Sequence, residues 1–266
     1  MTPPALGALL ALSLCACATL TVSQERRLGA QTSQQLRREL VIMNDRTVGG
    51  YIQRMGDDIL GAAGPQPFRF HFYVVEDDEI NAFAAPAGHI YIHTETILEA
   101  RNASELAGVM AHEIGHVVER HIAENYAKLQ GTDLAYRALV TTASLFGFGG
   151  MASLGGGLAA MAMLNSFSRG AEHEADAFAV SVLPGAGYDP NGLVTFFETL
   201  EREGGAHPPA LLASHPTTSH RIANARAEIA ELPPTPGLRV NDGGRLEIIQ
   251  RRIRLLTRRR LPDSWR

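Results

Sequence analysis

The segment from Ala111 to His116 reads AHEIGH, with two histidines four residues apart and a glutamate directly after the first. On a helix, side chains at positions i and i+4 lie on the same face, so His112 and His116 can direct imidazole nitrogens at one metal ion. Glu113 would then lie beside the remaining coordination position, where it could act as a general base. This spacing predicts a metal-dependent hydrolase, although an HExxH sequence alone also occurs on ordinary solvated helices.

The residues around this segment predict one long and mostly buried helix. Asn102 is followed three residues later by Glu105, a pair typical of a capping box at the start of a helix. The apolar positions at helical spacing are Leu106, Val109, Met110, Ile114, Val117 and Val118. Imidazoles on a buried helix need polar partners, and a metal ion would satisfy both of them.

The third ligand decides which kind of metal site this is. The metzincin pattern HExxHxxGxxH would place a glycine at position 119 and a histidine at position 122, but the chain has Glu119 and Ile122 there. His121 is one position away from that pattern. At about 100° per residue it points away from His112, so we expect it to be a surface or helix-capping residue.

A second predicted helix offers a carboxylate ligand instead. It lies in the segment SRGAEHEAD, from Ser168 to Asp176. Glu172 and Asp176 share one face, so the first can bind a metal while the second orients a ligand histidine through a hydrogen bond. Glu174 is turned by about 200° from Glu172, and we expect it to face solvent.

Four segments, in this order, resemble the gluzincin peptidases of family M48. They are NAFAAPAGHIYI (Asn81 to Ile92), AHEIGHVVERH (Ala111 to His121), SRGAEHEADAFA (Ser168 to Ala179) and SHPTTSHR (Ser214 to Arg221). The region of resemblance runs from about residue 30 to residue 231. It implies an α+β fold: a mainly helical, zincin-like metalloprotease domain with a small mixed β-sheet and an HExxH active-site helix.

The resemblance also implies roles for individual residues. One zinc ion per chain would be held by His112, His116 and Glu172, with Glu113 as the catalytic base. Asp176 would support a ligand histidine. His215 would lie near the metal, either as a fourth ligand in a resting state or as a polar group that faces the reacting carbonyl. A metal held by three protein ligands can lower the pKa of a bound water from 15.7 to roughly 7, so Glu113 could take its proton near neutral pH.

The segment from Asn81 to Ile92 has an alternating pattern and is expected to form an extended edge segment with which a substrate could pair as an added strand. The expected substrate-binding residues are Asn81, Ala82, Phe83 and Gly88. An ordinary core strand is the alternative. Family members usually have two glycines after the proline of this segment, whereas here Pro86 is followed by Ala87 and Gly88. Before it, residues 24–42 and 47–63 look helical, and residues 68–75 look like a strand.

The N-terminal residues predict export. Residues 5–16 form an apolar stretch too short to span a bilayer, which needs roughly 20 residues, and typical of a signal-peptide core. It leads into LCAC, which ends at Cys17 and resembles the lipobox of bacterial lipoproteins. Cleavage before Cys17 would leave this cysteine for lipidation, and Ala18 after it favours the outer membrane, facing the periplasm. No basic residue precedes the apolar core, so an uncleaved anchor or a plain secretory signal stays an alternative.

The expected organisation is a signal peptide at residues 1–16, a lipid-tethered linker at 17–29, a zinc metallopeptidase domain at 30–232 and a basic extension at 233–266. With 266 residues, 45% of them hydrophobic, the chain can bury one substantial core. The uncharged run at residues 138–168 predicts two short helices around a glycine-rich turn, packed on the core, covering the site or in contact with a membrane.

The C-terminal residues 245–266 hold eight arginines against two acidic residues, although the whole chain has a formal charge of −4. Ile249, Ile253 and Leu256 lie at helical spacing there. This segment could meet anionic lipid headgroups or a partner, or it could pack one apolar stripe on the body. Nucleic acid is not an expected partner of an exported chain.

Competing catalytic sites find little support in the sequence. No GxSxG elbow is present, both cysteines lie in the export segment, and the GxGxxA match at residues 147–152 lacks the flanking strand of a dinucleotide site. We therefore expect a zinc-dependent metalloendopeptidase that degrades misfolded or misassembled cell-envelope proteins. The alternative is an envelope lipoprotein of the same fold that mainly binds assembly clients, as a chaperone would, with little turnover.

Overall fold

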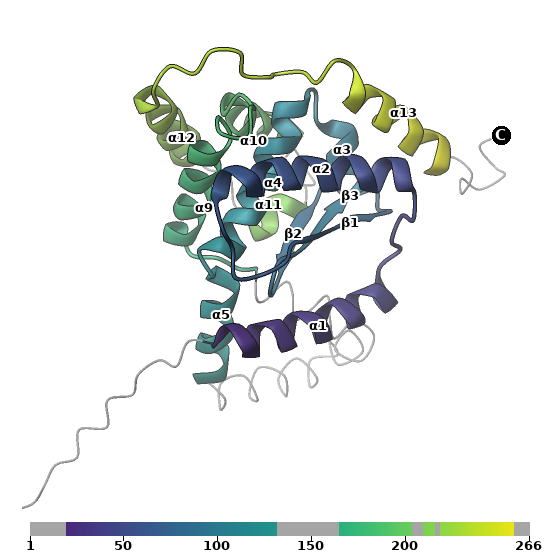
Figure 1. Cartoon of the computed structure of the whole chain (residues 1–266), viewed down its shortest axis with the longest axis vertical. Helices are drawn as coiled ribbons and strands as arrows, with labels where there is room; N and C mark the ends of the chain where they lie inside the picture. The colour runs from purple at the N-terminus through teal and green to yellow at the C-terminus, as the bar shows by residue number, and fades with distance from the viewer. Residues whose placement is uncertain (1–19, 132–164, 204–209, 216–218, 258–266) are drawn as a thin grey trace, which may run out of the picture.

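The computed structural model describes residues 20–131, 165–203, 210–215 and 219–257, and its elements are shown in Figure 1. The strands are β1 (His71–Val75), β2 (Ala82–Ala85) and β3 (His89–His93). The helices are α1 (Val22–Glu39), α2 (Arg46–Ala63), α3 (Thr94–Glu99), α4 (Ala103–Val118), α5 (His121–Gly131), α9 (Arg169–Val182), α10 (Asn191–Glu203), α11 (Ala210–Ser214), α12 (Ser219–Glu231) and α13 (Arg245–Thr257). The predicted α+β class, mainly helical with a small mixed sheet, is confirmed. The signal segment, Cys17 and nearly all of the uncharged run lie outside the described residues.

The two N-terminal helices occur where the hydrophobic pattern predicts them. Thr21 and Gln24 form a reciprocal capping box at the start of α1, so the expected linker is helical from residue 22 onward. The helix ends at Glu39, three residues earlier than expected, because Leu40 is extended and Ile42 forms a bridge with Val75. The chain therefore leaves α1 along the sheet.

The strand order is β1-β3-β2, with β3 parallel to β1 and antiparallel to β2. The expectation that the whole segment from Asn81 to Ile92 lies at an edge was therefore wrong for its second half. β3 is an ordinary core strand paired on both sides, and β1 and β2 lie at the two edges of the described sheet. Strand order depends on pairing with β1, which an alternating pattern within one segment does not encode.

Helices cover both faces of the sheet, as Figure 1 shows for α1 and α2. Gly56 of α2 lies against the Phe72 ring so closely that a Cβ atom at this position would be 2.2 Å from it. On the opposite face, the Tyr91 hydroxyl and the Ser33 hydroxyl of α1 are 3.2 Å apart. Both helices are therefore part of the folded body.

The turn between β2 and β3 departs from the family pattern at Ala87. Ala87 has a φ of 61° and Gly88 a φ of 87°, so both adopt the left-handed conformation. Glycine populates this region without steric cost, whereas alanine pays roughly 1–2 kcal/mol for it. The backbone shape at this turn is thus one that suits two glycines.

Helix α4 runs through the centre of the molecule and is buried from Ala103 to Val117. Asn102 accepts a hydrogen bond from the Glu105 amide at 3.0 Å. The reciprocal half of the predicted capping box does not form, because the Glu105 carboxylate accepts from the Arg101 amide instead. Small residues let neighbouring helices approach: a Cβ at Gly108 would lie 2.8 Å from the Leu193 backbone of α10, and one at Gly115 would lie 3.1 Å from the Ala175 carbonyl of α9.

The C-terminal helix α13 packs on the body, which is the second of the two expected arrangements. Leu246, Ile249 and Ile253 are buried, and the Gln250 amide donates to the carbonyls that end α3, including Ala100 at 2.7 Å. Arg252 makes two hydrogen bonds to the Asp45 carboxylate at the start of α2. Among the described helices, none is both long enough and apolar enough to cross a membrane.

The Asp45–Arg252 pair predicts a pH dependence of stability. The hydrogen bonds from Arg252 lower the pKa of Asp45 from 3.8 to about 2. Since the folded-state pKa is the lower one, the pair should stabilise the protein above about pH 4 and lose this effect as the pH falls through 2. Asp45→Asn, which keeps a helix-capping side chain, should lower the free energy of unfolding by at most about 1 kcal/mol at pH 7.

Urea unfolding of both proteins at stepwise lower pH measures this difference. We expect it to shrink between pH 4 and pH 2, and we expect no comparable effect of Arg251→Gln, which removes the neighbouring exposed arginine. A difference that persists unchanged at pH 2 would rule out the ion pair as its source.

Candidate metal centre

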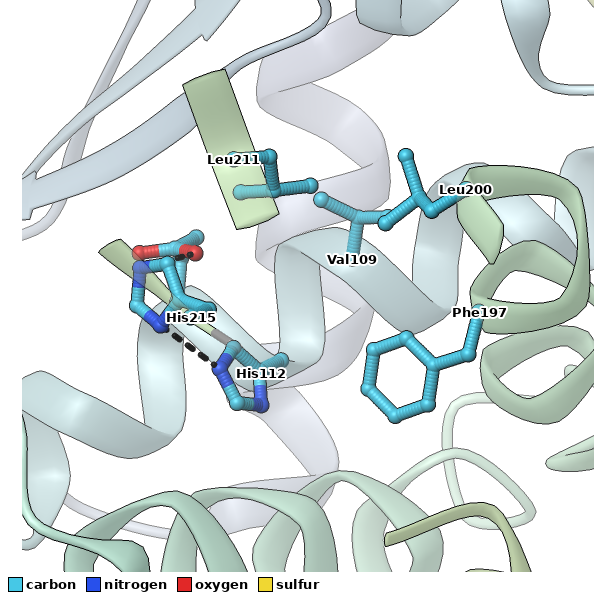
Figure 2. A pocket seen from close by; sticks show the side chains of 7 residues that line it. Val109, His112, Phe197, Leu200, Leu211 and His215 are labelled. Atoms are coloured by element: carbon cyan, nitrogen blue, oxygen red, sulfur yellow. Dashed lines mark hydrogen bonds and ion pairs between the residues drawn. The ribbon is translucent and has the colours of Figure 1, made fainter. Parts of the chain in front are cut away.

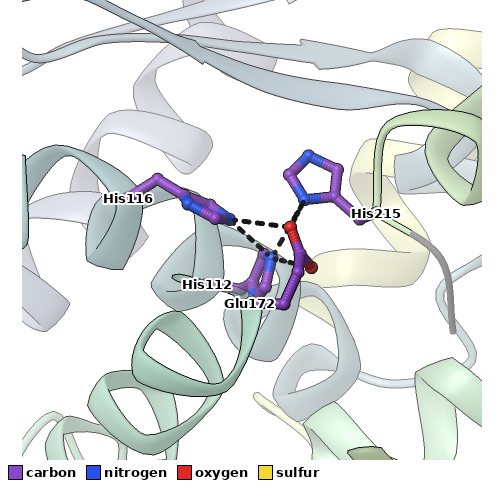
Figure 3. Close-up of side chains that lie close together, drawn as sticks. All are labelled: His112, His116, Glu172 and His215. Atoms are coloured by element: carbon purple, nitrogen blue, oxygen red, sulfur yellow. Dashed lines mark hydrogen bonds and ion pairs between the residues drawn. The ribbon is translucent and has the colours of Figure 1, made fainter. Parts of the chain in front are cut away.

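Four buried side chains from three parts of the chain meet at one place, as Figure 3 shows. His112 and His116 come from α4, Glu172 from α9, and His215 directly follows α11. One potential ligand atom of each lies within 4.8 Å of those of the other three. The sequence-predicted residues of the HExxH helix and of the second helix are thus brought together.

The distances between these atoms fit a metal ion. The two Nε2 atoms of His112 and His116 are 3.1 Å apart, and each lies 3.6 Å from a Glu172 carboxylate oxygen. Tetrahedral zinc with bonds of about 2.0–2.1 Å needs ligand atoms roughly 3.3 Å apart. Imidazole and carboxylate are also the ligand types that zinc takes in catalytic sites, so the residues present fit this ion.

The position of Asp176 agrees with the role suggested by its spacing. Its Oδ1 lies 2.9 Å from His112 Nδ1. A carboxylate only accepts hydrogen bonds, so the proton of His112 belongs on Nδ1 and the lone pair on Nε2 faces the centre of the group. This contact would orient His112 and favour the tautomer that a metal ligand needs.

Arg221 of α12 is a residue of this site that sequence reasoning did not single out. Its Nη1 lies 2.7 Å from Glu172, and its Nε and Nη2 both donate to Asp176 at 2.7 Å. Burial tends to raise the pKa of Asp176, but the hydrogen bonds from Arg221 and His112 outweigh it and leave the pKa below its ordinary value. The one available signal was its position in the motif SHPTTSHR, six residues after His215.

The expectation for His121 was wrong. Its side chain is only 3% exposed, and its Nδ1 lies 3.0 Å from His116 Nδ1. The helical angle of 100° per residue does not apply, because α4 ends at Val118 and Arg120 has a φ of 62°. The chain turns there and brings His121 back against the HExxH helix. Glu174 has a 63% exposed side chain, as expected, but it also contacts His121 Nε2 at 2.9 Å.

Glu113 and His215 face each other at the remaining side of the group. Glu113 Oε1 lies 3.6 Å from His215 Nε2, and His215 Nδ1 lies 2.9 Å from Glu172. Burial raises the pKa of Glu113, and the neighbouring His215 and His112 oppose this shift. Burial also lowers the pKa of His215, but Glu113 and Glu172 outweigh it and raise the pKa above its usual value. The carboxyl group of Glu113 therefore holds a proton more readily than a free carboxyl group, and the imidazole of His215 more readily than a free imidazole.

A small apolar cavity of about 10 Å³ adjoins His112, Glu113 and His215. Figure 2 shows its apolar wall, formed by Val109, Phe197, Leu200 and Leu211. A volume of this size accommodates about one water molecule and no amino-acid side chain. Leu211 of α11 and His215 form part of its lining.

The expected substrate-binding residues lie in and around β2. Ala82 and Phe83 belong to this edge strand, Asn81 directly precedes it, and Gly88 lies in the turn that follows. The strand approaches the candidate base, since the main chain of Ala84 contributes to the pKa of Glu113. Ala82 and Phe83 thus lie on the same strand as Ala84, and Gly88 lies in the turn after it.

Arg221 provides a test of the electrostatic balance. Arg221→Gln removes the cation between two buried carboxylates, so we expect the free energy of unfolding to fall by about 3–5 kcal/mol. Arg226→Gln on the same helix removes an arginine with a 60% exposed side chain that pairs with Glu198, and it should cost about 1 kcal/mol or less. Urea unfolding measures both values. Equal losses of unfolding free energy in the two variants would show that Arg221 does not stabilise the two buried carboxylates.

Comparison with known proteins gives consistent matches. The model of "Peptidase family M48" matches residues 47–229. The chain is 35% identical over 225 residues to the "Beta-barrel assembly-enhancing protease" of Escherichia coli K12, covering 81% of this chain and 46% of that protein. It is 34% identical over 148 residues to the "Mitochondrial metalloendopeptidase OMA1" of Arabidopsis thaliana, covering 56% and 29%.

A further relative is the "Metalloprotease YcaL" of Escherichia coli K12, which is 29% identical over 176 residues that make up 66% of each chain. The chain spans about half the length of the assembly-enhancing proteases that it matches. The matched region contains the four side chains that meet in the metal centre.

Proposed function

Because the chain belongs to peptidase family M48, we propose that it is a zinc-dependent endopeptidase that hydrolyses peptide bonds at the site formed by α4, α9 and α11. The observation that carries this proposal is the meeting of His112, His116, Glu172 and His215 within 4.8 Å. Glu113 lies beside this group without belonging to it. That is the arrangement in which a metal and a general base can act on one carbonyl.

His112, His116 and Glu172 would hold the ion, and His215 would be a fourth ligand in the arrangement described above. Zinc bound there would polarise a peptide carbonyl and lower the pKa of a water molecule to roughly 7. Glu113 would accept a proton at its carboxylate and return it to the leaving amine nitrogen. Its raised pKa suits both transfers. Asp176 would keep His112 in the metal-binding tautomer.

A substrate would extend the sheet by pairing with β2, an edge strand of the described sheet. This proposal is supported by the position of β2 at the sheet edge and by the proximity of Ala84 to Glu113. Main-chain pairing of this kind needs an extended substrate and few particular side chains, as expected for unfolded segments. The cavity beside His215 is too small for a substrate side chain, so α11 would have to move before a substrate binds.

The biological role would be the removal of misfolded or misassembled cell-envelope proteins. Support comes from the relatives named for enhancing β-barrel assembly and from the N-terminal sequence, which resembles a lipoprotein signal. The alternative, a client-binding factor with low turnover, would use the same fold. The presence of Glu113 together with a complete set of ligand side chains favours the peptidase.

Glu113→Gln tests the peptidase assignment. Glutamine has nearly the same shape but cannot take a proton, so we expect cleavage of casein to fall by at least about 100-fold. The zinc content should stay at one ion per chain, because Glu113 is not among the ligand group. Glu119→Gln, at an exposed position just after the same helix, should cleave normally.

Casein cleavage by the variant and by the wild type distinguishes the two candidate roles. Undiminished digestion by Glu113→Gln would disprove the assigned mechanism. A wild-type protein that binds unfolded casein and one zinc ion without cleaving it would favour the client-binding alternative.

We also propose that Cys17 carries a lipid anchor that holds the protein on the outer membrane, facing the periplasm. Wild-type protein should sediment with membranes and yield a lipidated N-terminal Cys17 peptide in mass spectrometry. Cys17→Ser should be released as a soluble species, whereas Cys15→Ser should behave as wild type because residue 15 would leave with the signal. An unmodified Cys17 in the mature N-terminal peptide is incompatible with this proposal.

A further inference from the structure

A row of hydrogen-bonded side chains leads away from His116 to the surface of α9. His116 Nδ1 lies 3.0 Å from His121 Nδ1, and His121 Nε2 lies 2.9 Å from a Glu174 carboxylate oxygen. His116 and His121 are buried, whereas the Glu174 side chain is 63% exposed. None of the roles described so far uses Glu174 or His121.

The carboxylate fixes where the protons lie along this row. Glu174 can only accept a hydrogen bond, so the short contact places the proton of His121 on Nε2. A neutral imidazole has one proton, and His121 Nδ1 then has a lone pair that accepts from His116. His116 therefore donates through Nδ1, and its Nε2 keeps the lone pair that a metal ligand requires.

The opposite order is unfavourable at both ends. A proton on His121 Nδ1 would leave the Nε2 lone pair facing a carboxylate oxygen at 2.9 Å. It would also move the proton of His116 to Nε2, the atom that lies 3.1 Å from His112 Nε2 at the centre of the ligand group. His116 could not bind a metal through that atom.

The turn before His121 is held in place from outside the site. Arg120 has a φ of 62°, and its guanidinium pairs at 2.9 Å with Glu25 of α1. The Glu25 side chain is buried, and the Glu119 amide donates to the Gly115 carbonyl at 2.9 Å. This fixed turn lets His121 contact His116, which is only five positions earlier in the chain.

The geometry points to Glu174 as a positioning residue that sets, through His121, the tautomer and orientation of His116 and thereby the affinity of the site for zinc. The inference rests on the proposed function, because it concerns the same metal centre. Helix α9 would then supply one ligand, Glu172, and the carboxylates that orient both histidines of α4. Asp176 acts on His112 directly, and Glu174 acts on His116 through one intervening imidazole.

Substitutions at the exposed Glu174 test this inference with little risk of unfolding. Glu174→Gln keeps an oxygen that can accept from His121 and should bind zinc within about threefold of wild type. Glu174→Ala should weaken binding by about tenfold, at the lower end of the 10–100-fold range for such partners, because water can replace part of the contact. Glu174→Lys presents a donor to His121 Nε2, favours the wrong tautomer and should weaken binding more than alanine does.

The zinc dissociation constant is measured by competition with a chromophoric chelator at fixed pH, and the cobalt-substituted proteins give a visible spectrum that reports ligand geometry. His173→Lys is the matched control, because it adds a positive charge at the adjacent position, where the side chain is 51% exposed. It should bind zinc within about threefold of wild type. The melting temperature of each metal-free protein shows that the variants are folded.

The order of zinc affinities among these variants tests the role of Glu174. Equal affinity of wild type, Glu174→Ala and Glu174→Lys would overturn the inference, as would an equal loss in His173→Lys and Glu174→Lys. A wild-type protein that fails to bind one zinc ion would instead overturn the proposed function. His121→Phe should remove any further effect of Glu174→Lys, since the two residues act in series.

Discussion

The metal site depends on the close packing of α4 against α9. Gly115 lies so near Ala175 that a larger side chain would push the two helices apart. This contact brings two carboxylates of α9 against the histidines of α4 in a buried space. Buried carboxylates are costly unless they are paired, and Arg221 from α12 contacts both of them. The metal ligands, the helix that carries the arginine and the small residues of the interface are therefore parts of one electrostatic arrangement.

His215 belongs to the same arrangement. The Glu172 carboxylate lies 2.9 Å from its Nδ1, and apolar residues line a cavity beside it with space for about one water molecule. This cavity is too small for a substrate side chain, so in the proposed function α11 would move before an extended segment pairs with the edge of β2.

Features that depend on the spacing of neighbouring residues could be predicted from the sequence. The shared face of His112 and His116, and that of Glu172 and Asp176, follow from the helical period. Features that depend on a break or on a distant partner could not. His121 was misplaced because the positive φ of Arg120 ends the helical period, and Arg221 was missed because its ion pairs join residues far apart in the chain. Likewise, the central position of β3 depends on its pairing with β1, and the packing of the buried stripe of α13 on the body depends on residues far away in the chain.

The proposed function requires that His112, His116, Glu172 and His215 hold one zinc ion. X-ray absorption at the zinc edge, on protein loaded with one equivalent of zinc, measures the ligands directly. We expect nitrogen and oxygen ligands at about 2.0–2.1 Å, with the outer-shell scattering of imidazole rings, and loss of part of that scattering in His116→Ala. A spectrum that resembles hydrated zinc, or one that His116→Ala leaves unchanged, would contradict it.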